Sequence, residues 1–155
     1  MFFLYNIISK IFLVLSPLVI FVRMIIGKED AKRFLEKYSF TIRNKSSETI
    51  WFHGASIGEL MSILPLIKKF EKDKSIKKIL VTSSTISSAS IIKKIKFKKT
   101  VHVYYPFDVG FICNNFLNKW KPKIAIFVDS EIWPNMFEKI NTKKIPLILI
   151  NARIT

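Results

Sequence analysis

The sequence predicts an α/β fold with a doubly wound, mainly parallel sheet that follows an apolar N-terminal helix. From Thr49 onward, apolar strand-like segments alternate with segments whose apolar residues recur at helical spacing. The strand-like segments contain continuous apolar runs such as ILV, IAIFV and LILI, which are typical of strands covered by helices on both faces. Strands and helices that alternate in this way favour a parallel sheet with right-handed crossovers.

Length and composition narrow the function classes. A chain of 155 residues, half of them apolar, is long enough for one domain with a sizeable core. The formal net charge of +15 indicates attraction to nucleic acid, anionic headgroups or phosphorylated substrates, although a compositional bias toward lysine explains it equally well. The single cysteine, Cys113, fits a reducing compartment and excludes a disulfide framework and a cysteine-based zinc site.

Residues 1–26 are predicted to form a membrane anchor. Phe2 to Val22 contain one charge, Lys10, and 21 helical residues span about 30 Å, roughly the thickness of a bilayer core. Lys10 and Pro17 also allow a segment that lies in the membrane interface, and a buried core helix is a third alternative. The cations that follow predict that the rest of the chain stays on the cytoplasmic side; they are Arg23, Lys28, Lys32, Arg33 and Lys37.

The remaining elements follow in order. The polar residues 27–48 predict a membrane-proximal helix and linker, and 49–155 predict the doubly wound domain. Strands are expected within 49–55, 77–84, 100–108, 123–133 and 145–155, with helices over about 60–70, 87–97, 110–120 and 135–142.

Polar residues follow all five predicted strands. The stretches are HGASIGE, TSSTISS, YYPFD, DSEIWPN and NARIT. Because ligands of doubly wound sheets bind at the carboxyl ends of the strands, we expect the functional site at this edge.

Ser56 and Glu59 allow two interpretations that do not exclude one another. Their Ser-x-x-Glu spacing is that of a capping box, in which both side chains bind backbone amides at a helix start. Alternatively, Gly58 lets a ligand approach the backbone and Glu59 acts as a general base, whose negative charge is favoured at a helix N-terminus.

The other strand ends offer further candidates. Thr82, Ser83, Ser84 and Thr85 can hydrogen-bond an anion at the start of the helix that follows them, or they can simply cap it. Asp129 and Glu131 lie two residues apart and share one face of an extended strand end.

Other polar features indicate no cofactor. His53 and His102 each lie on an apolar strand, where a lone histidine is most often structural, and no third metal ligand is evident, so no metal is expected. The chain contains neither a dinucleotide-binding glycine fingerprint nor a P-loop. Lysines within 68–78 and 93–99 predict a solvated face, or a contact with headgroup phosphates if they lie near a membrane.

Together these stretches resemble the N-terminal half of the 3-deoxy-D-manno-octulosonic acid (Kdo) transferases. An apolar anchor is followed by WFHGASIGE, VTSSTISS, YYPFD, DSEIWPN and INARIT in that order. The resemblance implies a GT-B type glycosyltransferase whose Rossmann-like N-terminal half binds the lipid A precursor, while a C-terminal domain holds CMP-Kdo. It implies Glu59 as the catalytic base. The expected substrate-binding residues are Ser56, Gly58, Thr82, Ser83, Ser84, Asp129, Glu131 and Arg153.

The sequence departs from the family pattern at two places. Asp129-Ser130-Glu131 stands where the family tends to have Glu-Thr-Glu, and EKYSF stands where a Glu-Arg-Phe-Gly-like element is usual. The resemblance also ends at Thr155, which predicts that the nucleotide-sugar domain is missing and that the enzyme is split or truncated.

The sequence therefore predicts the acceptor half of a Kdo transferase of lipopolysaccharide biosynthesis at the cytoplasmic face of the inner membrane. CMP-Kdo would be bound only through a separate C-terminal domain, without which the chain should be inactive. The alternative is a non-catalytic membrane-associated protein that binds anionic lipid. Nucleic-acid binding is not expected, because the chain lacks a basic motif interleaved with aromatic residues.

Overall fold

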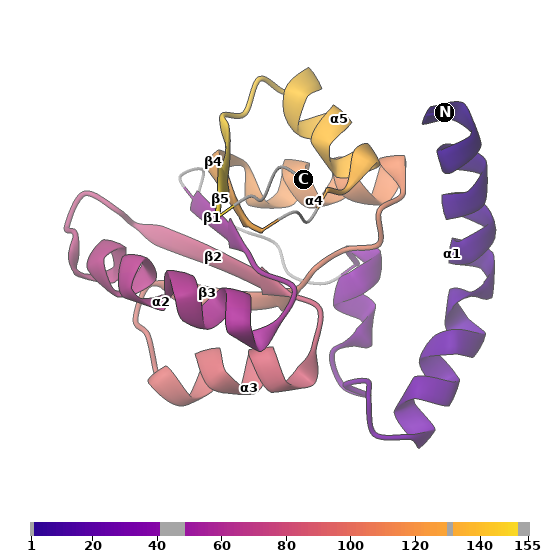
Figure 1. The fold of residues 1–155 in the computed structure, drawn as a ribbon, viewed down its shortest axis with the longest axis horizontal. Coiled ribbons are helices and arrows are strands. Elements are labelled where there is room, and N and C mark those ends of the chain that lie inside the picture. Colours follow the sequence, from indigo (N-terminus) through magenta and orange to yellow (C-terminus); the bar gives the residue numbers. More distant parts are fainter. Residues whose placement is uncertain (1, 41–48, 130–131, 152–155) are drawn as a thin grey trace.

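A computed structural model describes residues 2–40, 49–129 and 132–151 of the chain. An N-terminal helix and a short 3-10 helix precede a domain in which strands and helices alternate (Figure 1). The elements are α1 (Phe2–Ile25), η1 (Phe34–Tyr38), β1 (Thr49–His53), α2 (Ile57–Lys72), β2 (Lys78–Ser83), α3 (Ile86–Ile95), β3 (Thr100–Tyr104), α4 (Gly110–Trp120), β4 (Pro122–Val128), α5 (Pro134–Thr142) and β5 (Leu147–Ile150).

The five described strands form one parallel sheet with the order β3-β2-β1-β4-β5. This confirms the predicted doubly wound fold. After β3 the chain crosses to the other side of β1 to form β4, so the strand order reverses between β1 and β4. The carboxyl ends of these two strands therefore mark the place where ligands of such sheets bind.

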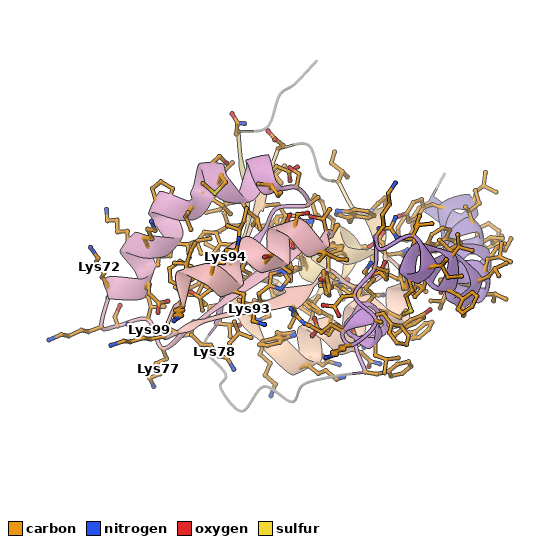
Figure 2. The ribbon with its side chains drawn as sticks, turned by 90° about the horizontal axis from the view of Figure 1, so that it is seen from below. Lys72, Lys77, Lys78, Lys93, Lys94 and Lys99 are labelled. Atoms are coloured by element: carbon orange, nitrogen blue, oxygen red, sulfur yellow. The ribbon has the colours of Figure 1, made fainter. Side chains whose placement is uncertain are left out.

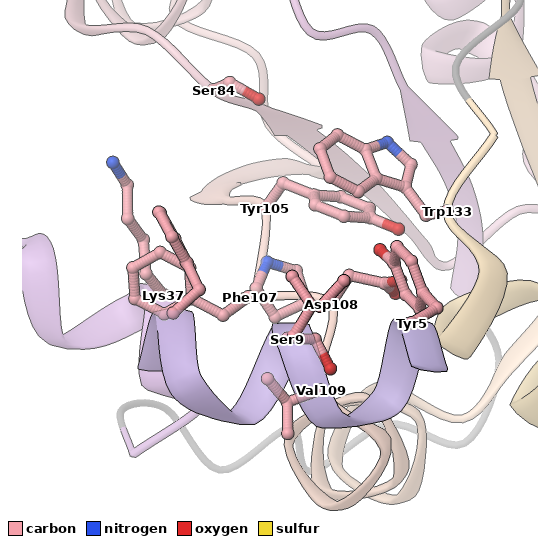
Figure 3. A pocket seen from close by; sticks show the side chains of 12 residues that line it. Tyr5, Ser9, Lys37, Ser84, Tyr105, Phe107, Asp108, Val109 and Trp133 are labelled. Carbon is pink, nitrogen blue, oxygen red and sulfur yellow. The ribbon is translucent and has the colours of Figure 1, made fainter. Parts of the chain in front are cut away.

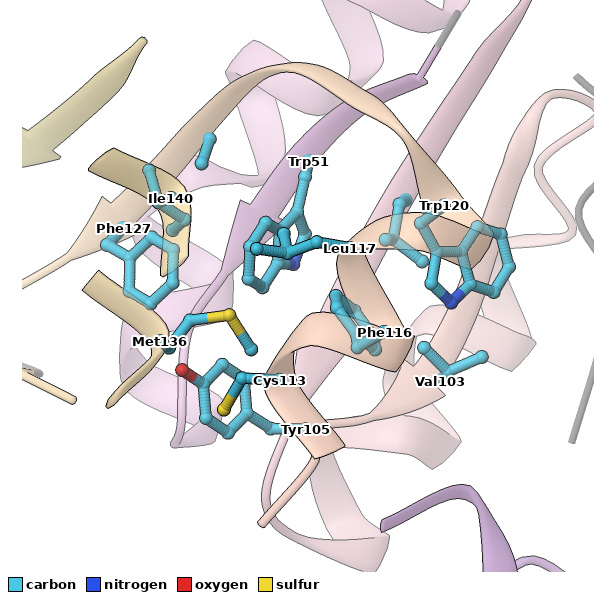
Figure 4. Packing of buried hydrophobic residues seen from close by; sticks show 12 residues of the cluster. Trp51, Val103, Tyr105, Cys113, Phe116, Leu117, Trp120, Phe127, Met136 and Ile140 are labelled. Carbon is cyan, nitrogen blue, oxygen red and sulfur yellow. The ribbon is translucent and has the colours of Figure 1, made fainter. Parts of the chain in front are cut away.

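Helices cover both faces of the sheet, which explains the continuous apolar strands. Trp51 belongs to a cluster with side chains of α4 and α5, among them Phe116 and Met136 (Figure 4). Its neighbour Phe52 points to the opposite face and packs with α2 and α3 through residues such as Leu60. Both sides of each central strand are thus buried.

The segment after α1 covers the free edge of β3. The Glu36 carboxylate accepts the backbone amide of Tyr104 at 2.9 Å, and the Arg33 guanidinium donates to the carbonyl of His102 at 2.8 Å. Arg33 also forms a bidentate pair with Glu36 at 2.8 and 2.9 Å. The described part of the predicted linker is therefore docked on an edge strand whose polar groups would otherwise be open.

Six lysines gather at the end of the molecule opposite α1 (Figure 2). They flank the starts of β2 and β3 and the ends of α2 and α3, and so lie at the amino ends of the strands; they are Lys72, Lys77, Lys78, Lys93, Lys94 and Lys99. This position is remote from the carboxyl edge and from α1. It favours a solvated face over a contact with headgroups beside the predicted anchor.

Candidate functional site

The loops that follow β1 and β4 form the centre of what we call the carboxyl-edge site, comprising Gly54–Glu59, Ser84 and Asp129. His53, the last residue of β1, pairs with Phe127 of β4. Ala55 and Asp129 each lie two residues beyond that pair, and the Ser84 amide donates to the Ala55 carbonyl at 3.2 Å. The structure thus brings the ends of β1, β2 and β4 together, as the sequence predicted.

Glu59 sits in the first turn of α2 with both carboxylate oxygens engaged. One oxygen accepts the Ala55 amide at 2.7 Å and the other accepts the Ser56 hydroxyl at 2.6 Å. Ser56 is the N-cap of the helix, and its oxygen accepts the Glu59 amide at 3.3 Å. The capping interpretation is therefore confirmed, with the glutamate reaching back to the residue before the cap.

The same contacts leave Glu59 able to do chemistry. The side chain is half-buried, and two hydrogen bonds fix its orientation. Each carboxylate oxygen accepts one hydrogen bond in this arrangement and retains a second lone pair. A fixed, partly exposed carboxylate at a helix N-terminus can accept a proton from a substrate hydroxyl.

The two glycines around this turn differ in what surrounds them. A Cβ atom on Gly54 would lie 3.1 Å from Leu60 Cδ2 and 3.3 Å from the Leu60 amide, so a larger residue there would press α2 away from β1 by a few tenths of an ångström. A Cβ atom on Gly58 would meet only Ser56 Oγ, at 3.9 Å. Packing within the described residues does not require glycine at position 58, which leaves room for a ligand near the backbone.

We expect the two glycines to respond oppositely to alanine. Gly58→Ala should leave the melting temperature unchanged or raise it, because alanine favours a helix by up to about 1 kcal/mol. Gly54→Ala should lower it through the contacts with Leu60. Thermal melts of the two variants test this, and a Gly58→Ala protein that melts well below the parent would contradict it.

Thr82 and Ser83 are fully buried, and their hydroxyls bind neighbouring side chains. Thr82 Oγ1 accepts Trp51 Nε1 at 2.9 Å and lies 2.9 Å from His53 Nδ1, while Ser83 Oγ lies 2.8 Å from His102 Nε2. Ser84 is partly exposed. Substrate contact by Thr82 and Ser83 stays a prediction. In the structure, their hydroxyls hydrogen-bond to side chains of the neighbouring strands β1 and β3.

The cap of α3 is supplied by Thr85, the last of the four residues predicted to bind an anion or to cap this helix. Thr85 Oγ1 accepts the Ser88 amide at 3.2 Å, as expected for an N-cap threonine. Capping by this serine- and threonine-rich stretch is therefore confirmed, and it uses Thr85.

Both histidines are held neutral by burial. Burial lowers the pKa of His53 to about 3. Burial, and secondarily the Arg33 guanidinium, lower the pKa of His102 to about 3. An ordinary histidine pKa is about 6.5, so neither ring carries charge at neutral pH.

These histidines predict acid sensitivity of the fold. Between pH 6.5 and 3 the unfolded chain binds protons that the folded chain excludes, so stability is full above about pH 6.5 and is lost as pH falls. The loss should reach at most about 1.4 kcal/mol per pH unit for each ring. Melting temperatures in detergent should fall between about pH 7.5 and 5, and less steeply in His102→Gln. A flat profile in the parent chain would contradict this prediction.

Asp129 joins the ends of β4 and β5. It adopts a left-handed backbone conformation with φ 58°, which aspartate tolerates better than most residues. Its amide donates to the Ile150 carbonyl at 2.9 Å, and its carboxylate accepts Asn151 Nδ2 at 2.8 Å. Two further predicted site residues, Glu131 and Arg153, lie outside the described residues.

Asp108 has a role that the sequence analysis missed. It follows β3 and caps α5, accepting the amides of Asn135 at 3.0 Å and Met136 at 2.8 Å. Tyr5 of α1 donates its hydroxyl to the same carboxylate at 2.7 Å. The sequence could have indicated this role. The N-cap residue of α5 is Trp133, which makes no capping hydrogen bond with its side chain, so the cap of this helix has to come from another segment.

A cavity of about 420 Å³ lies between α1 and the carboxyl edge of the sheet (Figure 3). Ile8 and Phe12 of α1 line one side of the cavity, and Tyr105 and Trp133 line the other. The ring centroids of Tyr105 and Trp133 are 5.3 Å apart. Ser84, which binds the Ala55 carbonyl, also lines it. The cavity therefore adjoins the carboxyl-edge site and offers it a largely apolar neighbour.

The described residues hold no group of three or more His, Cys, Asp or Glu side chains that could bind a metal ion.

The strand order and the polar loops at its reversal define a Rossmann-like α/β domain, a class of domain whose ligands bind at the carboxyl edge of the sheet. A family model described as 3-deoxy-D-manno-octulosonic-acid transferase (kdotransferase) matches residues 32–155. The chain belongs to this family, and the resemblance stated from the motifs is confirmed.

Named relatives agree with this assignment. The chain is 37% identical over 153 residues to a 3-deoxy-D-manno-octulosonic acid transferase of Rickettsia bellii, covering 98% of this chain and 36% of that protein. It is 28% identical to the transferase of Haemophilus influenzae, over 95% of this chain and 36% of that protein. A bifunctional glycosyltransferase/methyltransferase of Fusobacterium nucleatum is 35% identical, over 98% of this chain and 23% of that protein. The chain thus spans about a third or less of the length of these relatives.

Proposed function

We propose that this chain is the acceptor-binding half of a Kdo transferase, which moves Kdo from CMP-Kdo to the lipid A precursor in lipopolysaccharide biosynthesis. The observation that carries the proposal is the Glu59 carboxylate, oriented by Ala55 and Ser56 at the point where the strand order reverses. Membership of the transferase family supplies the reaction class.

In the proposed reaction, Glu59 accepts the proton of an acceptor sugar hydroxyl. The acceptor oxygen forms a bond to the anomeric carbon of Kdo, the bond from that carbon to the CMP oxygen breaks, and CMP leaves with the electron pair. Attack from the face opposite the leaving group inverts the anomeric configuration. The protein holds the base and the hydroxyl in line with the donor. Such positioning supplies a large part of the rate enhancement in a transfer between two substrates.

The cavity beside the site suits an acceptor with an apolar part. Most of its lining area is apolar, with Lys37 and Asp108 as the charged groups among its lining residues, while Ser84 and the Ala55–Glu59 turn offer polar groups nearby. A sugar headgroup at Glu59 with an acyl chain in this cavity is the arrangement that we propose. Ser56, Gly58 and Asp129 are proposed to contact the sugar.

The proposed organisation has three parts. Residues 1–26 attach the chain to the inner membrane, and residues 49–155 form the acceptor domain on the cytoplasmic face. Residues 27–48 connect these two parts. Helix α1 is long and apolar enough to cross a membrane by length and composition. The binding of CMP-Kdo is proposed to belong to the part of the transferase that corresponds to the region of the relatives beyond the one this chain matches.

The decisive test supplies that donor domain. Residues 1–155 are fused to the C-terminal part of the R. bellii transferase that follows the matched region, and Kdo transfer from CMP-Kdo to the lipid A precursor is measured in membranes. We expect activity from the fusion and none from either part alone.

A matched fusion uses the N-terminal part of the H. influenzae transferase in place of this chain. If that fusion is active and the fusion with this chain is inactive, the catalytic proposal fails. Binding of the chain to anionic vesicles would then favour a non-catalytic lipid-binding protein.

A further inference from the structure

Helix α1 turns a polar stripe toward the domain. Its polar residues lie four or seven positions apart and therefore share one face of the helix; they are Tyr5, Ser9, Ser16 and Arg23. Tyr5 donates to Asp108 at 2.7 Å, Ser16 lies 2.7 Å from the Tyr38 hydroxyl, and Arg23 pairs with Glu29 at 3.1 Å. Asn135 reaches Ser9 at 3.5 Å, and Phe12 meets Phe107 edge to face.

These contacts occupy almost the whole length of the helix. The residues from Tyr5 to Arg23 correspond to about 27 Å of helix, close to the roughly 30 Å of a bilayer core. A helix that spanned the membrane with these contacts intact would draw Asp108, Asn135 and the start of α5 into hydrocarbon. A domain with irregular loop backbone and charged side chains is not stable there.

The opposite face of α1 is apolar and uncovered. Its exposed side chains follow one another from end to end of the helix and include Phe3, Leu4, Ile7, Ile11, Val14, Leu15, Leu18, Phe21, Val22 and Ile25. Such a continuous apolar surface on a single helix exceeds what a soluble monomer usually exposes.

A bilayer surface fits this face better than a protein partner does. Protein interfaces combine an apolar centre with a polar rim and about one hydrogen bond per 100–200 Å². The outward side chains of α1 named above offer no hydrogen-bonding group. Lys10 lies on α1 and Lys28 and Lys32 follow it in the chain; all three are exposed, and such cations complement anionic headgroups.

We propose that α1 lies in the plane of the membrane interface, so that its polar stripe stays on the domain and its apolar face enters one leaflet. This proposal rests on the membrane attachment proposed above and specifies its geometry. Both ends of α1 then lie on the same side of the membrane as the domain. The cavity between α1 and the carboxyl edge consequently opens beside the leaflet, and an acceptor could reach Glu59 without its acyl chain leaving the bilayer.

The test locates both chain ends. The full chain carries one protease-cleavable tag before Met1 and a different one after Thr155, and it is expressed in a bacterium with an inner membrane. Protease is added to spheroplasts and to inverted inner-membrane vesicles. We expect both tags to be cut in inverted vesicles and neither in spheroplasts. Cleavage of the N-terminal tag from the periplasmic side would overturn the in-plane geometry while leaving membrane attachment intact.

A pair of variants tests the apolar face itself. Val14→Asp, at the middle of the outward face, should lower the membrane-bound fraction about tenfold or more, since burial of that face drives attachment. Met61→Asp places the same charge at an exposed apolar position of α2 and should leave the bound fraction unchanged. Equal binding of both variants would overturn the proposal. A parent chain that stays in the soluble fraction would overturn the proposed membrane attachment and the in-plane geometry together.

Discussion

Glu59→Gln in the fused enzyme is expected to lower kcat by about 10²- to 10⁴-fold, the usual loss when a general base is removed. Glutamine keeps the size of the side chain. Its carbonyl oxygen can still accept the Ala55 amide, and its amide can donate to Ser56 Oγ. The turn should therefore keep its shape while the proton acceptor is lost. Initial rates and thermal melts of the same preparation measure both quantities.

Thr85→Ala is the matched control for capping. Thr85 caps α3 as Ser56 caps α2, so its loss should cost about 1 kcal/mol of stability with little change in kcat. If Glu59→Gln behaves like Thr85→Ala, with a lower melting temperature and normal turnover, Glu59 is only a cap. The base would then have to be sought elsewhere, with Glu131 the next candidate.

Asp108→Ala should be the most destabilising single substitution at the carboxyl edge. It leaves the amides of Asn135 and Met136 and the Tyr5 hydroxyl without their acceptor, and Asp108 itself is buried. Buried donors that lose a charged acceptor cost about 1–3 kcal/mol each, and such costs overlap within one network. We expect a loss of about 3 kcal/mol in denaturant unfolding of the chain in detergent.

Asp73→Ala provides the comparison for Asp108→Ala. Asp73 also accepts two hydrogen bonds, from the amide and hydroxyl of Ser75, but it lies in an exposed turn. Its removal should change the unfolding midpoint little, because water replaces the lost partner. Equal midpoints for the Asp108→Ala variant and the parent would show that Asp108 does not hold α5.

The fold, and the gathering of the polar loops at one edge of its sheet, were predictable because their signals are local. Apolar runs such as IAIFV and the helical spacing of Leu60, Ile63, Leu64 and Ile67 determine element type, and all four of these α2 residues are buried. Parallel strands then place the polar loops at one edge. Ser56 and Glu59 lie three residues apart, so their capping geometry could be predicted from spacing alone.

Contacts between distant segments could not be predicted in the same way. Nothing in the spacing of Glu36 and Tyr104 indicates that a side chain of the connecting segment binds a backbone amide of β3. Whether the hydroxyls of Thr82 and Ser83 face solvent or the core depends on Trp51, His53 and His102, which come from neighbouring strands. Such pairings follow from tertiary packing, and single-sequence patterns do not contain them.

The docking of Arg33 and Glu36 on β3 has a practical consequence for anyone who shortens the chain. A soluble form that starts at Thr49, where the sheet begins, would lose the carboxylate bound to Tyr104 and the guanidinium bound to His102. An uncovered strand edge pairs readily with another copy, so such a form would tend to assemble edge to edge. A form that starts at Gly27 discards the apolar helix and keeps the edge protected, which makes it the better choice for crystallisation or NMR.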